Sequence, residues 1–217
     1  MFGSRIARDE DGNLLVDGVG NYLADQVDED GVLPFIGDPN PDFVMNYTNT
    51  FEYKGLSLGF AINHTSGGDI YSTTTATLMG RGLTTDTENR LSTYILPGVN
   101  INTGLPNDIQ INNSNFYFDN GFASPADELS VYDGSVVRLR EVNVAYSLPS
   151  KLLNKTPFGK VTIKASAFNM WYNAYNTPDG VNFDPNTTGL GAGNGQGFEF
   201  LTGPSSKRYG LSVNLSF

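Results

Sequence analysis

Apolar and polar residues alternate with a period of two in several stretches of the chain. In Phe43–Tyr53 mainly apolar and aromatic side chains occupy the odd positions, and mainly polar ones occupy the even positions. This alternation predicts a β-strand with one apolar and one polar face. Lys54-Gly55 follows as a two-residue connection, and Leu56–His64 alternates again. The two stretches therefore predict a β-hairpin.

Three more stretches, Ser135–Ser147, Lys160–Trp171 and Lys207–Phe217, also alternate. The first changes phase halfway along, which a β-bulge near Arg140–Glu141 would produce. All five stretches are 9 to 13 residues long, and a tilted strand of about 9–11 residues crosses a lipid bilayer. The expected strands are thus long enough to span a membrane.

The connections between the expected strands alternate in length. Lys54-Gly55 and Leu148–Gly159 are short, the second with an expected helical turn at Pro149–Asn154, whereas Thr65–Gly134 and Tyr172–Ser206 are long. Outer-membrane barrels have short periplasmic turns and long extracellular loops. We therefore predict an all-β fold, an antiparallel transmembrane β-barrel, of which the chain holds about five strands with two long extracellular loops. Because the smallest such barrels have about 8 strands, we expect the chain to be a fragment of a barrel or one piece of a larger assembly.

The alternation also predicts which side chains face lipid and which face the lumen. We expect the apolar set to face outward: Met45, Tyr47, Phe51, Leu58, Phe60, Ile62, Val213 and Leu215. We expect the polar set to face the lumen: Thr48, Thr50, Ser57, Asn63, Lys164 and Asn214. A soluble β-sandwich would alternate in the same way, but a second sheet would cover its apolar face. Connections as long as these are uncommon in a compact domain, which favours the barrel.

The composition excludes several kinds of site. The 217 residues include no cysteine and one histidine, His64, which excludes disulfides, thiolate metal sites and sites that need two histidines. The net charge of −10 argues against a nucleic-acid partner. No apolar run approaches the ~18 residues of a membrane-spanning helix. The first residues contain no apolar signal-peptide core, so we expect that either the chain is cytosolic or its natural N-terminus lies further upstream.

Acidic residues are concentrated in residues 1–42, which hold ten Asp and Glu residues against two Arg residues. We interpret these residues as a solvated, extracellular acidic loop segment, and residues 43–217 as the strands of the barrel with their connections. Asp9–Asn13 and Asp28–Gly31 resemble calcium loops, but the first lacks the full ligand spacing and the glutamate at the twelfth position. Acidic turns are the simpler interpretation, and we expect no metal site.

No motif in the chain indicates an enzyme. His64 has no catalytic partner in the sequence, and there is no nucleophile-elbow motif. Gly189–Gly197 is rich in glycine but follows a loop instead of a strand, so it predicts an external loop and not a phosphate site. We therefore expect no catalytic residues and no cofactor.

The second long loop gathers side chains that suit the binding of a ligand: Tyr172, Tyr175, Asp179, Asn182, Phe183, Asp184, Phe198 and Phe200. Aromatic faces pack against sugar rings, while carboxylates and amides form hydrogen bonds with hydroxyl groups. Peptides would use similar contacts. Packing of the loop against itself is the alternative interpretation.

The last strand is the most regular of the five. Its apolar positions are Tyr209, Leu211, Val213, Leu215 and Phe217. A strand with this pattern at a chain end offers an edge that another sheet can extend. An ordinary lipid-facing strand has the same pattern, and both roles are compatible.

Several segments resemble the SusC/RagA family of TonB-linked outer-membrane transporters. Ile36–Phe43 (IGDPNPDF) and Asn49–Leu58 (NTFEYKGLSL) resemble a late barrel hairpin of that family, and Gly67–Tyr71 (GGDIY) resembles the start of the following loop. Asp133–Pro149 (DGSVVRLREVNVAYSLP) is similar to a block of the family that begins with DGS and ends with LP. Ala167–Tyr172 (AFNMWY) stands where the family has a G-x-N-L run, although Gly and Leu are replaced here. The resemblance covers nearly the whole chain, and it implies that the chain is a C-terminal fragment that supplies the closing strands of such a barrel.

The resemblance implies TonB-dependent import of a nutrient across the bacterial outer membrane, with a glycan or oligosaccharide favoured and a peptide as the other candidate. It implies a SusD-like surface lipoprotein, the TonB energising complex reached through a missing N-terminal part, the remainder of the barrel, the barrel-assembly machinery and membrane lipid as partners. The last strand would engage the assembly machinery, and its C-terminus would be periplasmic. Tyr172, Tyr175, Asp179, Phe183, Asp184 and Phe198 would contact substrate or lipoprotein. A secreted all-β carbohydrate-binding or adhesion module is the alternative.

Overall fold

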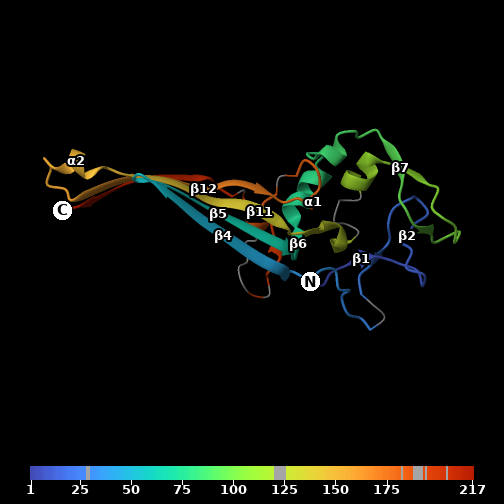
Figure 1. The fold of residues 1–217 in the computed structure, drawn as a ribbon. Helices are drawn as coiled ribbons and strands as arrows, with labels where there is room; N and C mark the ends of the chain where they lie inside the picture. Colours follow the sequence, from blue (N-terminus) through green and yellow to red (C-terminus); the bar gives the residue numbers. More distant parts are fainter. Residues whose placement is uncertain (28–29, 120–125, 182, 188–192, 194, 204) are drawn as a thin grey trace. The chain divides into compact units, whose positions relative to one another are not determined.

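A computed structural model describes the chain in two compact units (Figure 1). The described residues are 1–27, 30–119, 126–181, 183–187, 193, 195–203 and 205–217. The first unit, here the loop unit, comprises Met1–Pro41, Gly67–Gly134 and Asn176–Gly203. The second, here the strand unit, comprises Asp42–Ser66, Ser135–Tyr175 and Pro204–Phe217. The acidic segment and the two long connections thus form one unit, and the alternating stretches form the other.

The strand unit is built on one five-stranded sheet. Its strands are β4 (Pro41–Tyr53), β5 (Leu56–Gly67), β11 (Val136–Ser147), β12 (Lys160–Asn173) and β14 (Arg208–Ser216). They lie in the order β14-β12-β11-β5-β4, with antiparallel pairing of β14 with β12, β12 with β11, and β11 with β5 (Figure 1). All five predicted strands are confirmed, within three residues at each end.

The short connections follow the predictions. Lys54 and Gly55 adopt φ angles of 47° and 84°, which is the left-handed pair of a type I′ hairpin turn. The connection between β11 and β12 contains one short helix, α2 (Ser150–Leu153). Both turns therefore bring antiparallel neighbours together without a long excursion of the chain.

The predicted β-bulge is confirmed in the middle of β11. The register shifts between Leu139 and Glu141 in the pairing with both neighbours, β5 and β12. Arg140 is the extra residue in the pairing with β5, so that side chains before and after it keep the same face despite their opposite parity. The phase change in the sequence thus has a local structural cause.

In the part of the chain that the structure describes, neither face of the sheet is covered by a second sheet, as the apolar face of a β-sandwich would be. On the predicted outward face Met45, Phe51 and Val213 are 53%, 58% and 55% exposed, while Phe60 and Ile62 are half-buried. On the other face Asn63 is buried and its amide nitrogen lies 3.0 Å from Oδ1 of Asn46. Among the described residues, no second sheet packs over the apolar face.

The loop unit is an assembly of short strands and helical turns. Its strand pairs are β1 (Arg5–Ile6) with β3 (Ala24–Asp25), β2 (Leu15–Val16) with β8 (Val99–Asn100), and β7 (Thr93–Ile95) with β9 (Gln110–Asn112), while β6 (Asp69–Ser72) lies between β10 (Val131–Asp133) and β13 (Phe198–Glu199). Its helical segments are α1 (Thr73–Gly80), the 3-10 helices η1 (Thr85–Thr87), η3 (Asp127–Ser130) and η4 (Pro185–Thr187), and the π-helix η2 (Asn115–Asp119). None of the helices in the described part of the chain is long and apolar enough to cross a membrane.

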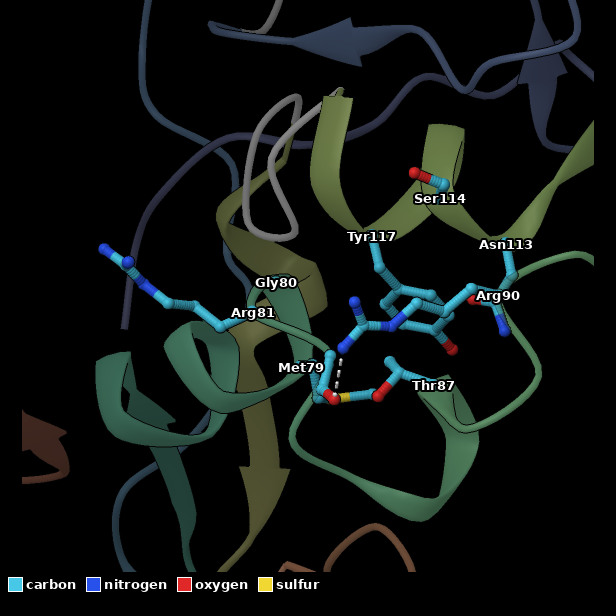
Figure 2. Close-up of a pocket in the computed structure, with 9 residues that line it drawn as sticks. Met79, Gly80, Arg81, Thr87, Arg90, Asn113, Ser114 and Tyr117 are labelled. Carbon is cyan, nitrogen blue, oxygen red and sulfur yellow. Dashed lines mark hydrogen bonds between the residues drawn. The ribbon is translucent and has the colours of Figure 1, made fainter.

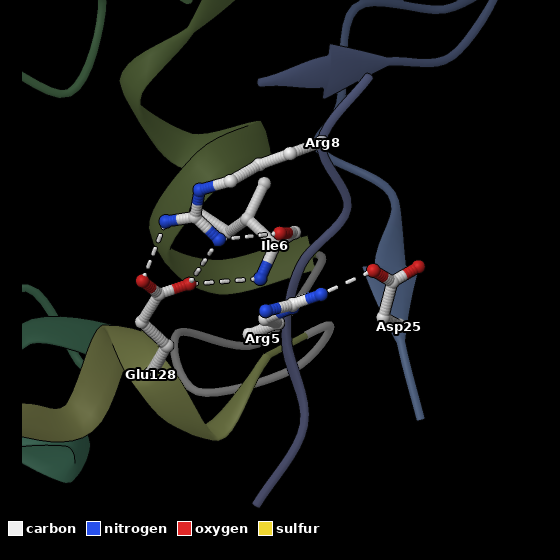
Figure 3. A network of polar contacts seen from close by, with 5 residues as sticks. All are labelled: Arg5, Ile6, Arg8, Asp25 and Glu128. Carbon is white, nitrogen blue, oxygen red and sulfur yellow. Dashed lines mark hydrogen bonds and ion pairs between the residues drawn. The ribbon is translucent and has the colours of Figure 1, made fainter. Parts of the chain in front are cut away.

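The acidic segment buries some of its apolar side chains, whereas none of its described acidic residues is buried. Ile6 and Val16 are buried. The carboxylate of Glu128 accepts hydrogen bonds from the backbone N–H of Ile6 at 2.9 Å and from the guanidinium of Arg8 at 2.7 Å (Figure 3). These contacts attach the segment to η3, 120 residues further along the chain. No local pattern in the sequence predicts this connection.

Candidate functional site

The predicted ligand-contact residues divide between the two units. Tyr172 and Tyr175 belong to the strand unit, whereas Asp179, Phe183, Asp184 and Phe198 belong to the loop unit. Asn182 lies outside the described residues, as do Asp28 and Glu29 of the second acidic turn and most of Gly189–Gly197.

Tyr172 lies opposite Arg138 in the pairing of β12 with β11. The Cζ atom of Arg138 is 5.7 Å from the centroid of the Tyr172 ring, and the arginine is buried at 3% exposure. A guanidinium over an aromatic face at this distance is a cation–π contact. Tyr172 therefore has a structural partner in the sheet, and its half-buried ring is held in place by it.

Tyr175 follows β12 and meets the end of β5. Its hydroxyl oxygen lies 3.1 Å from Nε2 of His64, and the ring of Phe43 packs edge-on against the imidazole at 5.3 Å between centroids. Tyr175 remains 45% exposed. The structure thus joins the single histidine to one of the predicted contact residues, which sequence spacing could not show.

Phe183 and Asp184 are placed differently from the other predicted contact residues. Phe183 is 7% exposed and forms a buried cluster with Ile70 and Val181. Asp184 is 3% exposed, and its carboxylate accepts a hydrogen bond from the backbone N–H of Asn186 at 3.1 Å. Both side chains are therefore committed to packing within the loop unit, whereas Asp179 is exposed.

Phe198 belongs to an aromatic cluster on the edge of β13. Its ring is stacked on that of Phe200, with 6.0 Å between centroids and 5° between planes, and both lie against Tyr71. Phe200 is 55% exposed. Burial, followed by the nearby charge of Asp127, raises the pKa of the Tyr71 hydroxyl, so this hydroxyl stays protonated and donates to Asp127.

Glu199, between the two phenylalanines, points to the opposite side of β13 and is fully buried. Its carboxylate accepts hydrogen bonds from the hydroxyl of Ser72 and from the backbone N–H and hydroxyl groups of Thr74 and Thr202. Burial alone would raise the pKa of the carboxyl group, but the hydrogen bonds from Thr74 and Thr202 outweigh it and lower the pKa. Sequence reasoning missed this residue, although its place between two aromatic residues in a short strand was a usable signal.

In the first acidic turn, the carboxylate of Asp9 is occupied by hydrogen bonds within the turn. Oδ1 of Asp9 accepts hydrogen bonds from the backbone N–H groups of Asp11 and Asn13. The hydrogen bonds from the side chain and backbone of Asn13 are the main cause of the lowered pKa of Asp9. Among the described residues, no cluster of three or more His, Asp or Glu side chains could hold a metal ion.

The last strand forms one edge of the five-stranded sheet. β14 pairs with β12, and in the described part of the chain no strand pairs with its other side. Its apolar side chains are exposed, with Tyr209 at 71%, Leu211 at 76% and Phe217 at 89%. β4 forms the other edge. The sheet is open, and five strands are fewer than the ~8 of the smallest membrane barrels.

No family model matches the chain. Among curated proteins, the chain is similar to TonB-dependent receptor P3 of Formosa agariphila, with 25% identity over 210 residues that cover 96% of the chain and 19% of the receptor. TonB-dependent receptor P26 of the same organism is 26% identical over 196 residues, 84% of the chain and 18% of the receptor. The chain thus spans about a fifth of the length of these relatives.

Solved structures of a RagAB peptide importer have the same fold. The "closed-closed" state matches 97% of the chain with a TM-score of 0.56 and 18% identity, over 20% of the importer chain. The "open-open" state matches the whole chain with a TM-score of 0.57 and 18% identity, over 22% of the importer chain. The open, antiparallel sheet therefore has the fold expected of a barrel section, and the predicted fold class is confirmed. The chain is therefore similar in sequence to TonB-dependent receptors and has the fold of a section of the RagAB importer.

Proposed function

We propose that the chain forms the closing section of a TonB-dependent barrel that imports a nutrient across the outer membrane. The observation that carries this proposal is the five-stranded sheet. Its apolar face is exposed, and its strands are long enough to cross a bilayer, so that this face would contact lipid. A secreted binding module would have to bury such a face. The similarity to TonB-dependent receptors adds support.

The proposed substrate is a glycan or oligosaccharide, with a peptide as the other candidate. Exposed aromatic side chains at Tyr175 and Phe200 and the exposed carboxylate of Asp179 suit both. The RagAB structures are those of a peptide importer, which keeps the second candidate open. The proposed partners are a SusD-like surface lipoprotein, the TonB complex, the barrel-assembly machinery and lipid.

The proposed topology places the Lys54-Gly55 turn and the α2 connection in the periplasm, together with the C-terminus, and the loop unit outside the cell. Protease added to intact cells should then cut within Thr65–Gly134 or Tyr172–Ser206 and spare the Lys54 turn. Cleavage at Lys54 without permeabilisation would overturn this orientation.

Uptake by intact cells that produce the full-length protein tests the function. Labelled oligosaccharides and labelled peptides are offered separately, with cells lacking the protein as the reference. Tyr175→Ala should reduce uptake while leaving the amount of folded barrel unchanged, since Tyr175 is exposed beside His64. Tyr175→Phe is the matched variant, because it keeps the ring and removes only the hydrogen bond. If neither class of substrate enters in a protein-dependent way, the proposed function is wrong.

A further inference from the structure

A pocket of about 230 Å³ lies in the loop unit, among residues that no sequence motif singled out (Figure 2). Its walls come from the end of α1, from the turn that follows, and from η2, which contributes Tyr117. Met79 and the Tyr117 ring supply apolar wall, and Arg90 supplies a positive charge. A volume of this size accommodates one sugar ring or one terminal amino-acid residue.

The end of α1 has a tightly defined backbone. Gly82 is in the left-handed region with φ of 70°. Its N–H donates to the carbonyl of Met79, and the N–H of Leu83 donates to the carbonyl of Leu78, both at 2.9 Å. This is the Schellman pattern that ends many helices, and it presents the Gly82 carbonyl in a fixed position.

Arg90 is seated on this glycine. Its Nη2 donates to the carbonyl oxygen of Gly82 at 3.2 Å. A Cβ atom on residue 82 would lie 2.6 Å from Nη2 and 2.9 Å from Cζ of the guanidinium, so alanine at this position would displace the end of the Arg90 side chain. Figure 2 shows Arg90 reaching into the pocket, whereas the side chain of Arg81 points away from it.

The backbone that carries Arg90 is fixed as well. The amide of Asn113, which is buried, donates to the carbonyls of Asp86 and Asn89 at 3.1 Å each. The hydroxyl of Thr87 donates to the carbonyl of Thr84 at 2.7 Å. The backbone beside Arg90 is therefore held in place, and the hydrogen bond to Gly82 orients the guanidinium of this exposed residue.

The positive charge in the pocket is not neutralised by the described part of the chain. Arg90 forms no ion pair with the described residues, and the Gly82 carbonyl is its one hydrogen-bond acceptor among them. Burial, followed by the charge of Asp86, raises the pKa of Tyr117, so the Tyr117 hydroxyl is neutral at physiological pH and leaves the charge of Arg90 in place. The other N–H groups of the guanidinium fork remain available to an anion.

We propose that this pocket binds the carboxylate of an organic ligand, with Arg90 as the recognising residue and the Tyr117 ring against the body of the ligand. A guanidinium fork pairs with a planar carboxylate through two parallel hydrogen bonds. The carboxylate could belong to a uronic acid or to the C-terminus of a peptide. The proposal rests on the proposed import function only for the origin of the ligand, because binding itself needs no transport.

Calorimetry on the full-length protein in detergent tests the proposal with two pairs of probes. The first pair is an oligogalacturonide and its methyl ester, and the second is a short peptide with a free and with an amidated C-terminus. In at least one pair the acidic probe should bind about tenfold more tightly than its neutral counterpart. The pair that shows the preference identifies the source of the carboxylate.

Arg90→Gln should remove this preference, while Arg81→Gln should keep it, because Arg81 borders the same pocket but its side chain points away from it. Gly82→Ala should also remove it by displacing the guanidinium. A melting curve shows whether each variant is folded. Equal binding of acidic and neutral probes in both pairs, or a preference that survives in folded Arg90→Gln, would overturn the proposal. Carboxylate-selective binding without uptake would contradict the import function alone.

Discussion

The carboxylate of Glu199 accepts a hydrogen bond from the hydroxyl of Ser72, with 3.0 Å between the two oxygens. Both residues are fully buried and lie 127 positions apart. Ser72 also caps α1, because its hydroxyl oxygen accepts from the backbone N–H of Thr75. One carboxylate thus joins the second long connection to the start of the helix in the first.

Glu199→Gln should loosen the start of α1. The amide nitrogen of glutamine would face the N–H and hydroxyl donors of Thr74 or Thr202, and leaving them unsatisfied costs about 2 kcal/mol. Hydrogen exchange of the first turn of α1 in the full-length protein should therefore be about 30-fold faster. Glu88→Gln is the control, because Glu88 is exposed. Unchanged protection in Glu199→Gln would mean that the carboxylate does not hold the helix.

Ionisation of Glu199 should also make the protection of the first turn of α1 depend on pH. Because the folded state lowers the pKa of Glu199 below its ordinary value of 4.5, ionisation stabilises the folded state. This contribution is complete above the ordinary pKa and is lost as the pH falls through the lower, folded value. Protection of the first turn of α1 should be constant from neutral pH down to about pH 5 and should fall in more acidic solution. The Glu199→Gln variant should lack that fall, and a variant that retains it would assign the effect to another group.

The hairpin turn between β4 and β5 should tolerate a change at one position and not at the next. At Gly55, alanine would be strained at φ of 84°, and its Cβ would lie 2.8 Å from the carbonyl oxygen of Ser147. We expect Gly55→Ala to cost about 1–2 kcal/mol. Lys54→Asn should be neutral or stabilising, because Asn-Gly is preferred in type I′ turns. The fraction of heat-modifiable barrel in urea measures both, and equal fractions in the two variants would argue against the turn geometry.

Two neighbouring positions of β14 should differ in their tolerance of a charge. Val213 lies on the exposed apolar face opposite Ile163, whereas Asn214 lies on the polar face opposite Thr162. In a barrel, Val213→Arg would place a charge in lipid at a cost of about 2–4 kcal/mol near the midplane. Asn214→Arg would face the lumen and should be tolerated. Heat-modifiable mobility on a gel compares the two, and the reverse order would show that the two faces are exchanged.

The amino-acid sequence by itself determined the strand unit. Alternation located all five strands, the two-residue turn at Lys54-Gly55 and the bulge beside Glu141. These features could be predicted because a strand repeats every two residues, so that each of them leaves a signal within about ten neighbouring positions. The resemblance of short segments to SusC/RagA proteins was found in the same stretches.

Only the tertiary structure decided the loop unit. Residues 1–42 gave no periodic signal, yet Glu128 binds them through Ile6 and Arg8. The sequence suggested a ligand contact for Phe183, and the structure adds that this side chain lies in a buried cluster with Ile70 and Val181. The pocket around Arg90 was not anticipated. In each case the contacts join short, irregular segments that are far apart in the chain. Burial and hydrogen bonding between such segments leave no regular pattern in the sequence from which they could be predicted.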